Sequence, residues 1–148
     1  MLALLNHPWL IEQRCEEIAG LEFTHRPFAA LKTALLDIVT QDANSESPAL
    51  DASQLHTQLL ETGLDGAVGQ VTRAVTHGGD RFAAAGAEPH VVIAGWTHAL
   101  AVHKSQVELI RALEAAERAW QNDQSEENAG RISELKALQG QRIDMEQV

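Results

Sequence analysis

The sequence has few aromatic residues and a single cysteine. Its 148 residues include no tyrosine, three tryptophans and three phenylalanines. Cys15 alone can form neither an intrachain disulfide nor a cysteine-based metal cage, which favours a reducing compartment. No apolar run approaches the roughly 18 residues that span a bilayer, and the N-terminus lacks the basic region and cleavage site of a signal peptide. We therefore expect a cytoplasmic protein.

Positive charge is also scarce in this chain. Eleven Lys and Arg are outnumbered by 21 Asp and Glu, which gives a formal net charge of −10. The basic residues are scattered, and no basic cluster is interleaved with aromatic residues. An acidic chain repels phosphate backbones and anionic membranes. The composition therefore predicts no direct contact with nucleic acid or membrane.

The residues that are abundant, leucine and alanine, favour helices. Apolar residues at three- and four-residue steps predict one helix from Pro8 to a stop at Gly20 and another from about Pro27 to Val39. Cys15 falls on the apolar stripe of the first, so we expect a small core residue. The polar segment Gln41–Pro48 predicts a loop. Residues 1–6 look like the last turns of a helix that begins before this chain does.

The middle of the chain predicts shorter elements. Asp51 and Gln54 have the spacing of a capping box at the start of a helix that Gly63 ends. A weaker helix is expected from Asp65 to Thr76. The stretch HGGDRFAAAGAEP predicts a loop with one helical turn near Phe82.

The longest helical pattern runs from Pro89 to about Asn122. Val92, Trp96 and Leu100 lie on one side of this helix. Leu109, Leu113 and Trp120 lie on a side rotated by roughly 100°. We infer that the two ends of the helix pack against different partners, the first of which is a helical bundle.

The second partner follows in the sequence. NDQS at 122–125 predicts a turn, and a last helix extends to about Gln147. A short turn between two helices predicts an antiparallel hairpin, with Leu113 near Leu135 and Ile110 near Leu138.

The predicted fold is thus all-α, with two parts. An N-terminal multi-helix bundle occupies residues 1–104, and a C-terminal antiparallel helical hairpin occupies residues 105–148. One long helix, about residues 89–122, is shared by both.

No catalytic chemistry is evident in the sequence. Seven histidines lack metal-ligand spacing, and His98 and His103 fall on different sides of a helix. The segment HGGD lacks the Lys and the Ser or Thr of a phosphate-binding loop. We predict no catalytic, cofactor-binding or metal-binding residue in this chain.

Trp120 has two interpretations. It either staples the hairpin turn against Ala129 or Ile132, or it anchors a partner, since tryptophan is enriched at binding hot spots. Ile143 and Met145 likewise are frayed terminal residues or partner contacts. Residues 105–148 carry five basic and nine acidic side chains, which favours a basic partner surface. The predicted partner-binding residues are Leu109, Leu113, Glu117, Trp120, Leu138, Arg142, Ile143 and Met145.

Segments at both ends of the chain resemble one family. LALLNHPWLIEQRCEEIAGLEF followed by LKTALLDI, and later Trp96, ELIRALEAAERAW and SEENAGRISELKALQ, are similar to the C-terminal helicase-binding domain of bacterial DnaG-type primases. Residues 41–88 match only in the number of helices. The resemblance implies a domain that docks on the N-terminal domains of the hexameric replicative helicase. In that family the hairpin supplies most of the binding and the bundle modulates the helicase.

The resemblance also implies a division of labour within a longer protein. The RNA-polymerising and zinc-binding domains, with their magnesium and zinc, would lie upstream, so the parent would be an enzyme and this chain a non-catalytic, monomeric domain. Two other interpretations remain. The helicase N-terminal domain is itself a helical bundle with a hairpin, so a fragment of it or another helical replication adaptor is one alternative. A small helical enzyme is the other.

Overall fold

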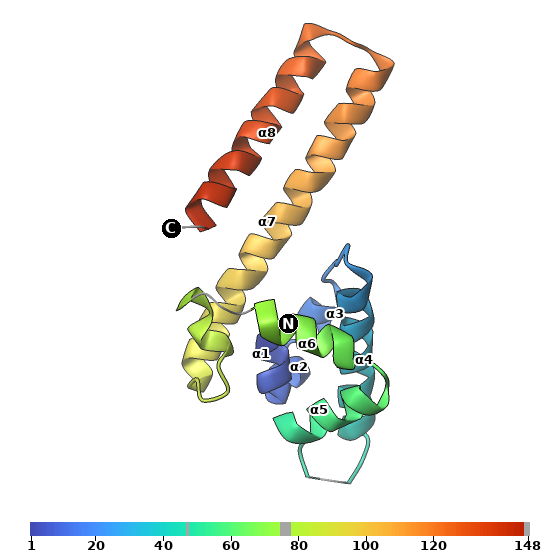
Figure 1. The fold of residues 1–148 in the computed structure, drawn as a ribbon, viewed down its shortest axis with the longest axis vertical. Helices are drawn as coiled ribbons and strands as arrows, with labels where there is room; N and C mark the ends of the chain where they lie inside the picture. The colour runs from blue at the N-terminus through green and yellow to red at the C-terminus, as the bar shows by residue number, and fades with distance from the viewer. Residues whose placement is uncertain (47, 75–77, 147–148) are drawn as a thin grey trace. The chain divides into compact units, whose positions relative to one another are not determined.

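The computed structural model of the chain is helical. It describes residues 1–46, 48–74 and 78–146, without the side chains of residues 74, 78–80 and 143–146. Within these ranges there is no strand, which confirms the predicted all-α class. None of the helices in the same ranges combines the length and apolar character that a bilayer crossing demands. In chain order (Figure 1) the elements are α1 (Leu2–Asn6), α2 (Pro8–Gln13), α3 (Cys15–Ala19), α4 (Arg26–Ala43), α5 (Ala52–Glu61), α6 (Asp65–Ala74), the 3-10 helix η1 (Gly78–Ala83), α7 (Pro89–Asn122) and α8 (Glu126–Glu146).

The chain divides into two compact units, Met1–Ala99 and Leu100–Val148. The boundary expected from the sequence lay between residues 104 and 105. The first unit contains α1 to α6, η1 and the beginning of α7. The second unit contains the remainder of α7 and α8, so a single helix belongs to both.

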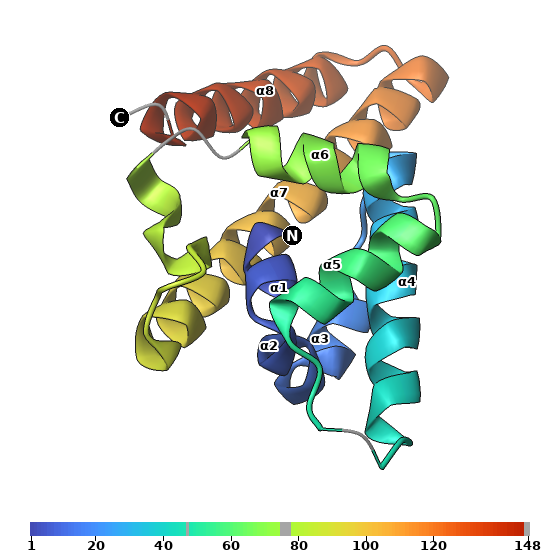
Figure 2. The ribbon, with the colours of Figure 1, turned by 60° about the horizontal axis from the view of Figure 1, so that its bottom comes forward.

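Helix α4 is the centre of the first unit, where it contacts α2, α3, α5 and α6 (Figure 2). Its predicted apolar stripe is buried, including Leu31 and Leu35 with no exposed surface. Helices as short as α1, α2 and α3 are not stable in isolation. They are held by tertiary burial, since Leu4, Leu10 and Ile18 are also fully buried.

The predicted helix from Pro8 to Gly20 is wrong in one respect, because it is broken at Arg14. This residue has φ −124° and ψ 24°, which ends α2, and α3 starts at Cys15. The Nη1 of Arg14 donates to Oε1 of Glu17 at 3.1 Å. The break changes the direction in which the following side chains point, so Cys15 is exposed and the expectation that it lies in the core is wrong.

Helix α4 is longer than predicted. It begins at Arg26 and continues to Ala43, so the first residues of the expected loop Gln41–Pro48 are helical. Oδ2 of Asp42 then accepts a hydrogen bond from the backbone N–H of Leu50 at 3.2 Å, which ties the end of α4 to the approach to α5.

The predicted capping box at the start of α5 is confirmed. Oδ1 of Asp51 accepts from the N–H of Gln54 at 2.8 Å, and Oε1 of Gln54 accepts from the N–H of Asp51 at 3.1 Å. Gly63 follows the helix with φ 78°, a conformation that glycine adopts without strain. Helix α6 buries Val68 and Val71 as predicted, whereas residues 75–77 of the expected Asp65–Thr76 helix and loop lie outside the described residues.

Replacing Asp51 with alanine should lower the free energy of unfolding by about 1 kcal/mol. The N–H of Gln54 loses its acceptor, and the reciprocal pair of hydrogen bonds in the capping box is broken. Urea denaturation followed by circular dichroism measures this loss. Ser53→Ala is the matched control, since Ser53 lies in the same turn and is exposed. Equal losses for the two variants would contradict the capping role of Asp51.

The opening motif LLNHP joins the first helices to η1. Nδ2 of Asn6 donates to the carbonyl of Ala83 at 2.8 Å, and Nε2 of His7 bonds to the carbonyl of Ala84 at 2.9 Å. Because a carbonyl only accepts, Nε2 of His7 carries the proton. His7 is 5% exposed, and Pro8 occupies the start of α2 as predicted. We call these two hydrogen bonds the Asn6–His7 clamp.

The first three turns of α7 complete the core of the first unit. Val92 and Trp96 are buried, as the sequence predicted. The indole Nε1 of Trp96 donates to Oε2 of Glu17 at 3.2 Å, a contact between residues 79 positions apart in the chain. Phe82 lies directly over Gly95, where an added Cβ atom would overlap the phenyl ring.

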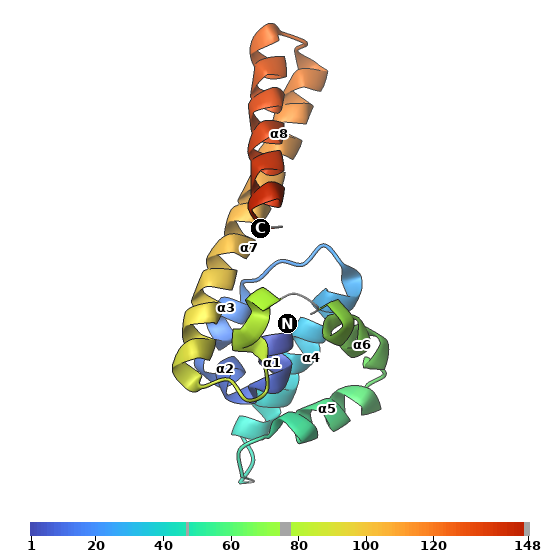
Figure 3. The ribbon, with the colours of Figure 1, turned by 60° about the vertical axis from the view of Figure 1, so that its left-hand side comes forward.

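The second unit is an antiparallel pair of helices, in which α8 lies beside the outer part of α7 (Figure 3). The turn falls where the sequence predicts it. Nδ2 of Asn128 donates to the carbonyl of Asp123 at 2.7 Å, and the backbone N–H of Asn128 donates to Oγ of Ser125 at 3.3 Å. Ala116 on α7 and Leu135 on α8 are the buried apolar residues of this unit among those the structure describes.

Candidate partner-binding surface

The hairpin has a narrow interior, and this leaves large apolar side chains in solvent. Its buried residues, Ala116 and Leu135, are flanked by side chains that a two-helix unit cannot enclose. Ile110 is 42% exposed, Trp120 is 38% exposed and Leu138 is 49% exposed. Ile110 and Trp120 lie on α7 and Leu138 lies on α8, so both helices of the hairpin present large apolar side chains as candidates for contact with a partner.

Trp120 borders a cleft near the turn of the hairpin, which we call the tip cleft. The cleft has a volume of about 430 Å³. Residues from both helices line it: Glu117, Trp120, Gln121, Ala129, Ile132 and Lys136. The indole therefore lies by Ala129 and Ile132, as the stapling interpretation requires, and it is also exposed, as the anchoring interpretation requires.

One ion pair crosses the tip cleft. Nζ of Lys136 lies 3.9 Å from Oε1 of Glu117, and the two side chains are 60% and 48% exposed. Such a long, solvated pair contributes little to stability, about 0–1 kcal/mol. The pair joins α7 to α8, and Nδ2 of Asn128 adds a second link to the carbonyl of Ala119 at 3.4 Å. The predicted proximity of Leu113 to Leu135 and of Ile110 to Leu138 stays a prediction.

The structure brings together only part of the predicted partner-binding set. Glu117 and Trp120 share the tip cleft, whereas Leu109 and Leu113 are half-buried. Leu138 follows Lys136 by two positions, which turns it about 200° around α8 and onto the other edge of the hairpin.

The remaining predicted residues lie toward the end of α8. Arg142 is half-buried. The side chains of Ile143 and Met145 lie outside the described residues, so their assignment to the surface stays a prediction.

Sequence reasoning named Ala129 and Ile132 as the residues against which Trp120 could pack, and it missed Lys136 on the α8 side of the tip cleft. Ile132 and Lys136 are four residues apart on one helix face, and Ala129 precedes Ile132 by one turn. That spacing was a usable signal for Lys136, because it places Lys136 on the helix face of Ile132.

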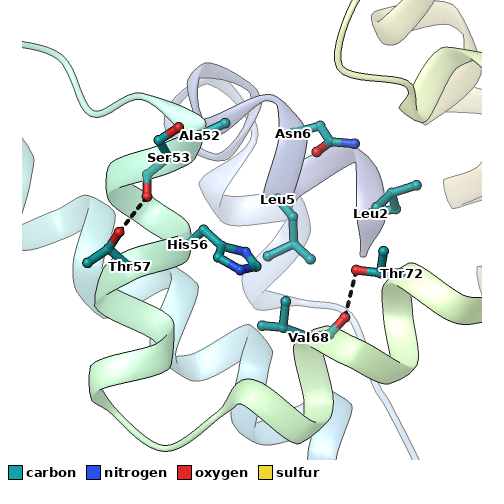
Figure 4. Close-up of a pocket in the computed structure, with 9 residues that line it drawn as sticks. All are labelled: Leu2, Leu5, Asn6, Ala52, Ser53, His56, Thr57, Val68 and Thr72. Atoms are coloured by element: carbon teal, nitrogen blue, oxygen red, sulfur yellow. Dashed lines mark hydrogen bonds between the residues drawn. The ribbon is translucent and has the colours of Figure 1, made fainter.

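A second cleft of about 660 Å³ lies in the first unit between α1, α5 and α6 (Figure 4). Leu5, His56 and Val68 point into it. The hydroxyl groups of Thr57 and Thr72 donate within their own helices, to the carbonyl of Ser53 at 3.0 Å and to the carbonyl of Val68 at 2.9 Å. The residues that line this cleft include no Asp, Glu, Lys, Arg or Cys.

Metal-ligating side chains were compared across the described ranges. No group of three or more His, Cys, Asp or Glu side chains there is placed to hold a metal ion.

The chain was compared with protein families, curated proteins and solved structures. Neither a protein-family model, nor a curated protein, nor a solved structure matches the chain. The fold itself is a helical bundle that shares its longest helix with a helical hairpin, and the hairpin carries the candidate binding surface.

Proposed function

We propose that this chain is a non-catalytic docking domain of a bacterial DNA primase. It binds the N-terminal domains of the replicative helicase, recruits the primase to the replication fork and modulates the helicase. It acts as a monomer in the bacterial cytoplasm, without direct contact to nucleic acid or membrane. Primer synthesis, together with zinc and magnesium, belongs to other domains of the parent enzyme.

The observation that carries this proposal is the exposed tryptophan at the hairpin tip. Trp120 borders an open cleft, and Ile110 lies on the same helix with 42% of its surface exposed. Large apolar groups beside charged residues are typical of the buried centre of a protein interface. A two-helix unit offers them no cover of its own, so a protein partner accounts for them best.

The identity of the partner rests on the family resemblance. The LLNHP motif at Leu4–Pro8 carries part of that resemblance, and its Asn6 and His7 side chains hold η1 in this fold. Two domains of the same fold are expected to share a motif, such as LLNHP, whose side chains stabilise that fold. The hairpin then supplies the binding surface and the bundle supports it.

Trp120→Ala should weaken binding to the helicase N-terminal domain by about 10- to 100-fold, which is the usual cost of removing an aromatic hot spot. Isothermal titration of the full chain against the isolated N-terminal domain of the replicative helicase from the same genome measures the change. Leu60→Ala is the control, because Leu60 is a large exposed residue of α5 in the other unit, with 46% of its surface accessible. Circular dichroism verifies that both variants are folded.

Two results would count against the proposal. If the unmodified chain forms no complex with the helicase domain by titration and by gel filtration, the docking function is wrong. If Trp120→Ala and Leu60→Ala bind with the same affinity as the unmodified chain, docking stands but Trp120 is not its anchor.

A further inference from the structure

We propose that the tip cleft receives one apolar side chain from a basic helix of the partner, and that a Lys or Arg of that helix replaces Lys136 beside Glu117. This inference rests on the proposed docking function and adds the chemistry of the surface that the partner must present. It identifies Glu117 as the residue that determines charge specificity and Trp120 with Ile132 as the walls that hold the apolar group.

The shape of the tip cleft fits an inserted side chain. Trp120 and Ile132 come from two different helices and border the same open space, with the small Ala129 beside them. An amphipathic helix can place one residue in such a groove while its neighbouring turns lie along the rims. The rims here are the α7 turn that carries Glu117 and the α8 turn that carries Lys136.

The charge around the tip cleft favours a basic partner. Residues 114–131 contain five carboxylates and two guanidinium groups. Glu114 precedes Glu117 by one turn on the same edge of α7, and Glu126 precedes Ala129 by one turn on α8; both are exposed. Lys136 is the one cation among the residues that line the cleft. A cationic helix would meet complementary charge at Glu114 and Glu117 on the α7 rim and at Glu126 near the start of α8.

The Glu117–Lys136 pair is suited to exchange. Its atoms are 3.9 Å apart and both side chains are about half exposed or more, so the pair is weakly held. The flexible Lys136 side chain can turn into solvent, and the carboxylate of Glu117 can then pair with a cation of the partner. An Arg there would form two parallel hydrogen bonds with the carboxylate.

A pair of charge variants tests the inference on the full chain. Titration against the helicase N-terminal domain at two salt concentrations should show that Glu117→Gln binds about threefold more weakly or worse, with a shallower salt dependence. Lys136→Gln removes the opposite charge from the same cleft, and it should bind more tightly than the unmodified chain because Glu117 no longer has to release Lys136. Weaker binding of Lys136→Gln with unchanged Glu117→Gln would indicate an acidic partner and overturn the inference.

A second probe separates this inference from the proposed function. Two synthetic amphipathic helices of identical leucine pattern, one with lysine and one with glutamate at every polar position, are added to ¹⁵N-labelled chain. The indole N–H signal of Trp120, assigned with Trp120→Phe, should move with the lysine peptide and stay in place with the glutamate peptide. The Trp9 and Trp96 signals serve as internal references.

The combined outcomes are distinguishable. If the helicase domain fails to bind while the lysine peptide moves the Trp120 signal, the proposed partner is wrong and the cleft chemistry stands. If the helicase domain binds while Glu117→Gln has no effect and neither peptide moves Trp120, docking stands and this inference is wrong.

Discussion

Replacing Leu35 with alanine is expected to lower the free energy of unfolding of the Met1–Ala99 unit by about 2–5 kcal/mol. Leu35 has no exposed surface and lies on α4, the helix that four other helices contact. Truncation removes its apolar contacts and leaves a cavity that neighbouring helices can fill only in part. A loss of this size approaches the total stability of an ordinary small domain, about 5–15 kcal/mol.

Tryptophan fluorescence during urea denaturation measures this loss in the Trp120→Phe background. Trp9 and Trp96, the tryptophans that remain, both lie in the first unit, so the signal reports that unit alone. Leu60→Ala removes the same atoms from a leucine that is 46% exposed on α5, and it should cost less than about 1 kcal/mol. If the two leucine variants lose similar stability, α4 is not the centre of the core.

Replacing Gly95 with alanine is expected to destabilise the chain by about 1–3 kcal/mol, although the change favours helix formation. In an unobstructed helix interior, alanine is preferred over glycine by about 1 kcal/mol. At Gly95 the new Cβ atom would overlap the ring of Phe82, so either the ring or the η1 segment must move. The steric cost exceeds the gain in helix propensity.

The same substitution at Gly130 provides the matched control with the opposite sign. Apart from the adjacent backbone of α8, no atom lies within 4 Å of a Cβ added at Gly130, so Gly130→Ala should stabilise by up to about 1 kcal/mol. Thermal denaturation followed by circular dichroism compares the two. In a Phe82→Ala background the Gly95 change should cost little. A Gly95→Ala variant more stable than the parent chain would contradict the described contact with Phe82.

Helix α7 shows what the sequence can predict well. Its bounds, Pro89 and Asn122, agree with the prediction because a proline marks the first turn, no glycine or proline follows Gly95, and turn residues end the run. The buried stripe of α4 was predictable for the same reason. Such features depend on residues near one another in the chain.

The break at Arg14 shows where the prediction fails. The apolar spacing from Leu10 to Ile18 suits a single helix, and no glycine or proline interrupts it. The chain nevertheless turns there, with Leu10 and Ile18 buried on either side of the break and Cys15 exposed. Burial against distant helices decides this geometry, and periodicity along one segment contains no information about it.

The candidate surface also has one part that the sequence could predict and one part that it could not. Glu117 and Trp120 share one face of α7 through a three-residue spacing, so sequence alone could group them. The rotation of α8 about its own axis determines that Lys136 faces them and that Leu138 does not. That rotation follows from the packing of Leu135, which a sequence pattern identifies only as apolar.

The Asn6–His7 clamp has a consequence for deletion mapping. Each of its hydrogen bonds joins residues 77 positions apart, so the first helix and the segment before α7 depend on each other. A fragment that retains residues 1–74 but ends before Ala83 leaves a buried imidazole without its acceptor, which destabilises it. Loss of binding in such a fragment would reflect misfolding of the remainder, and point substitutions on the intact chain are the sounder way to locate the binding surface.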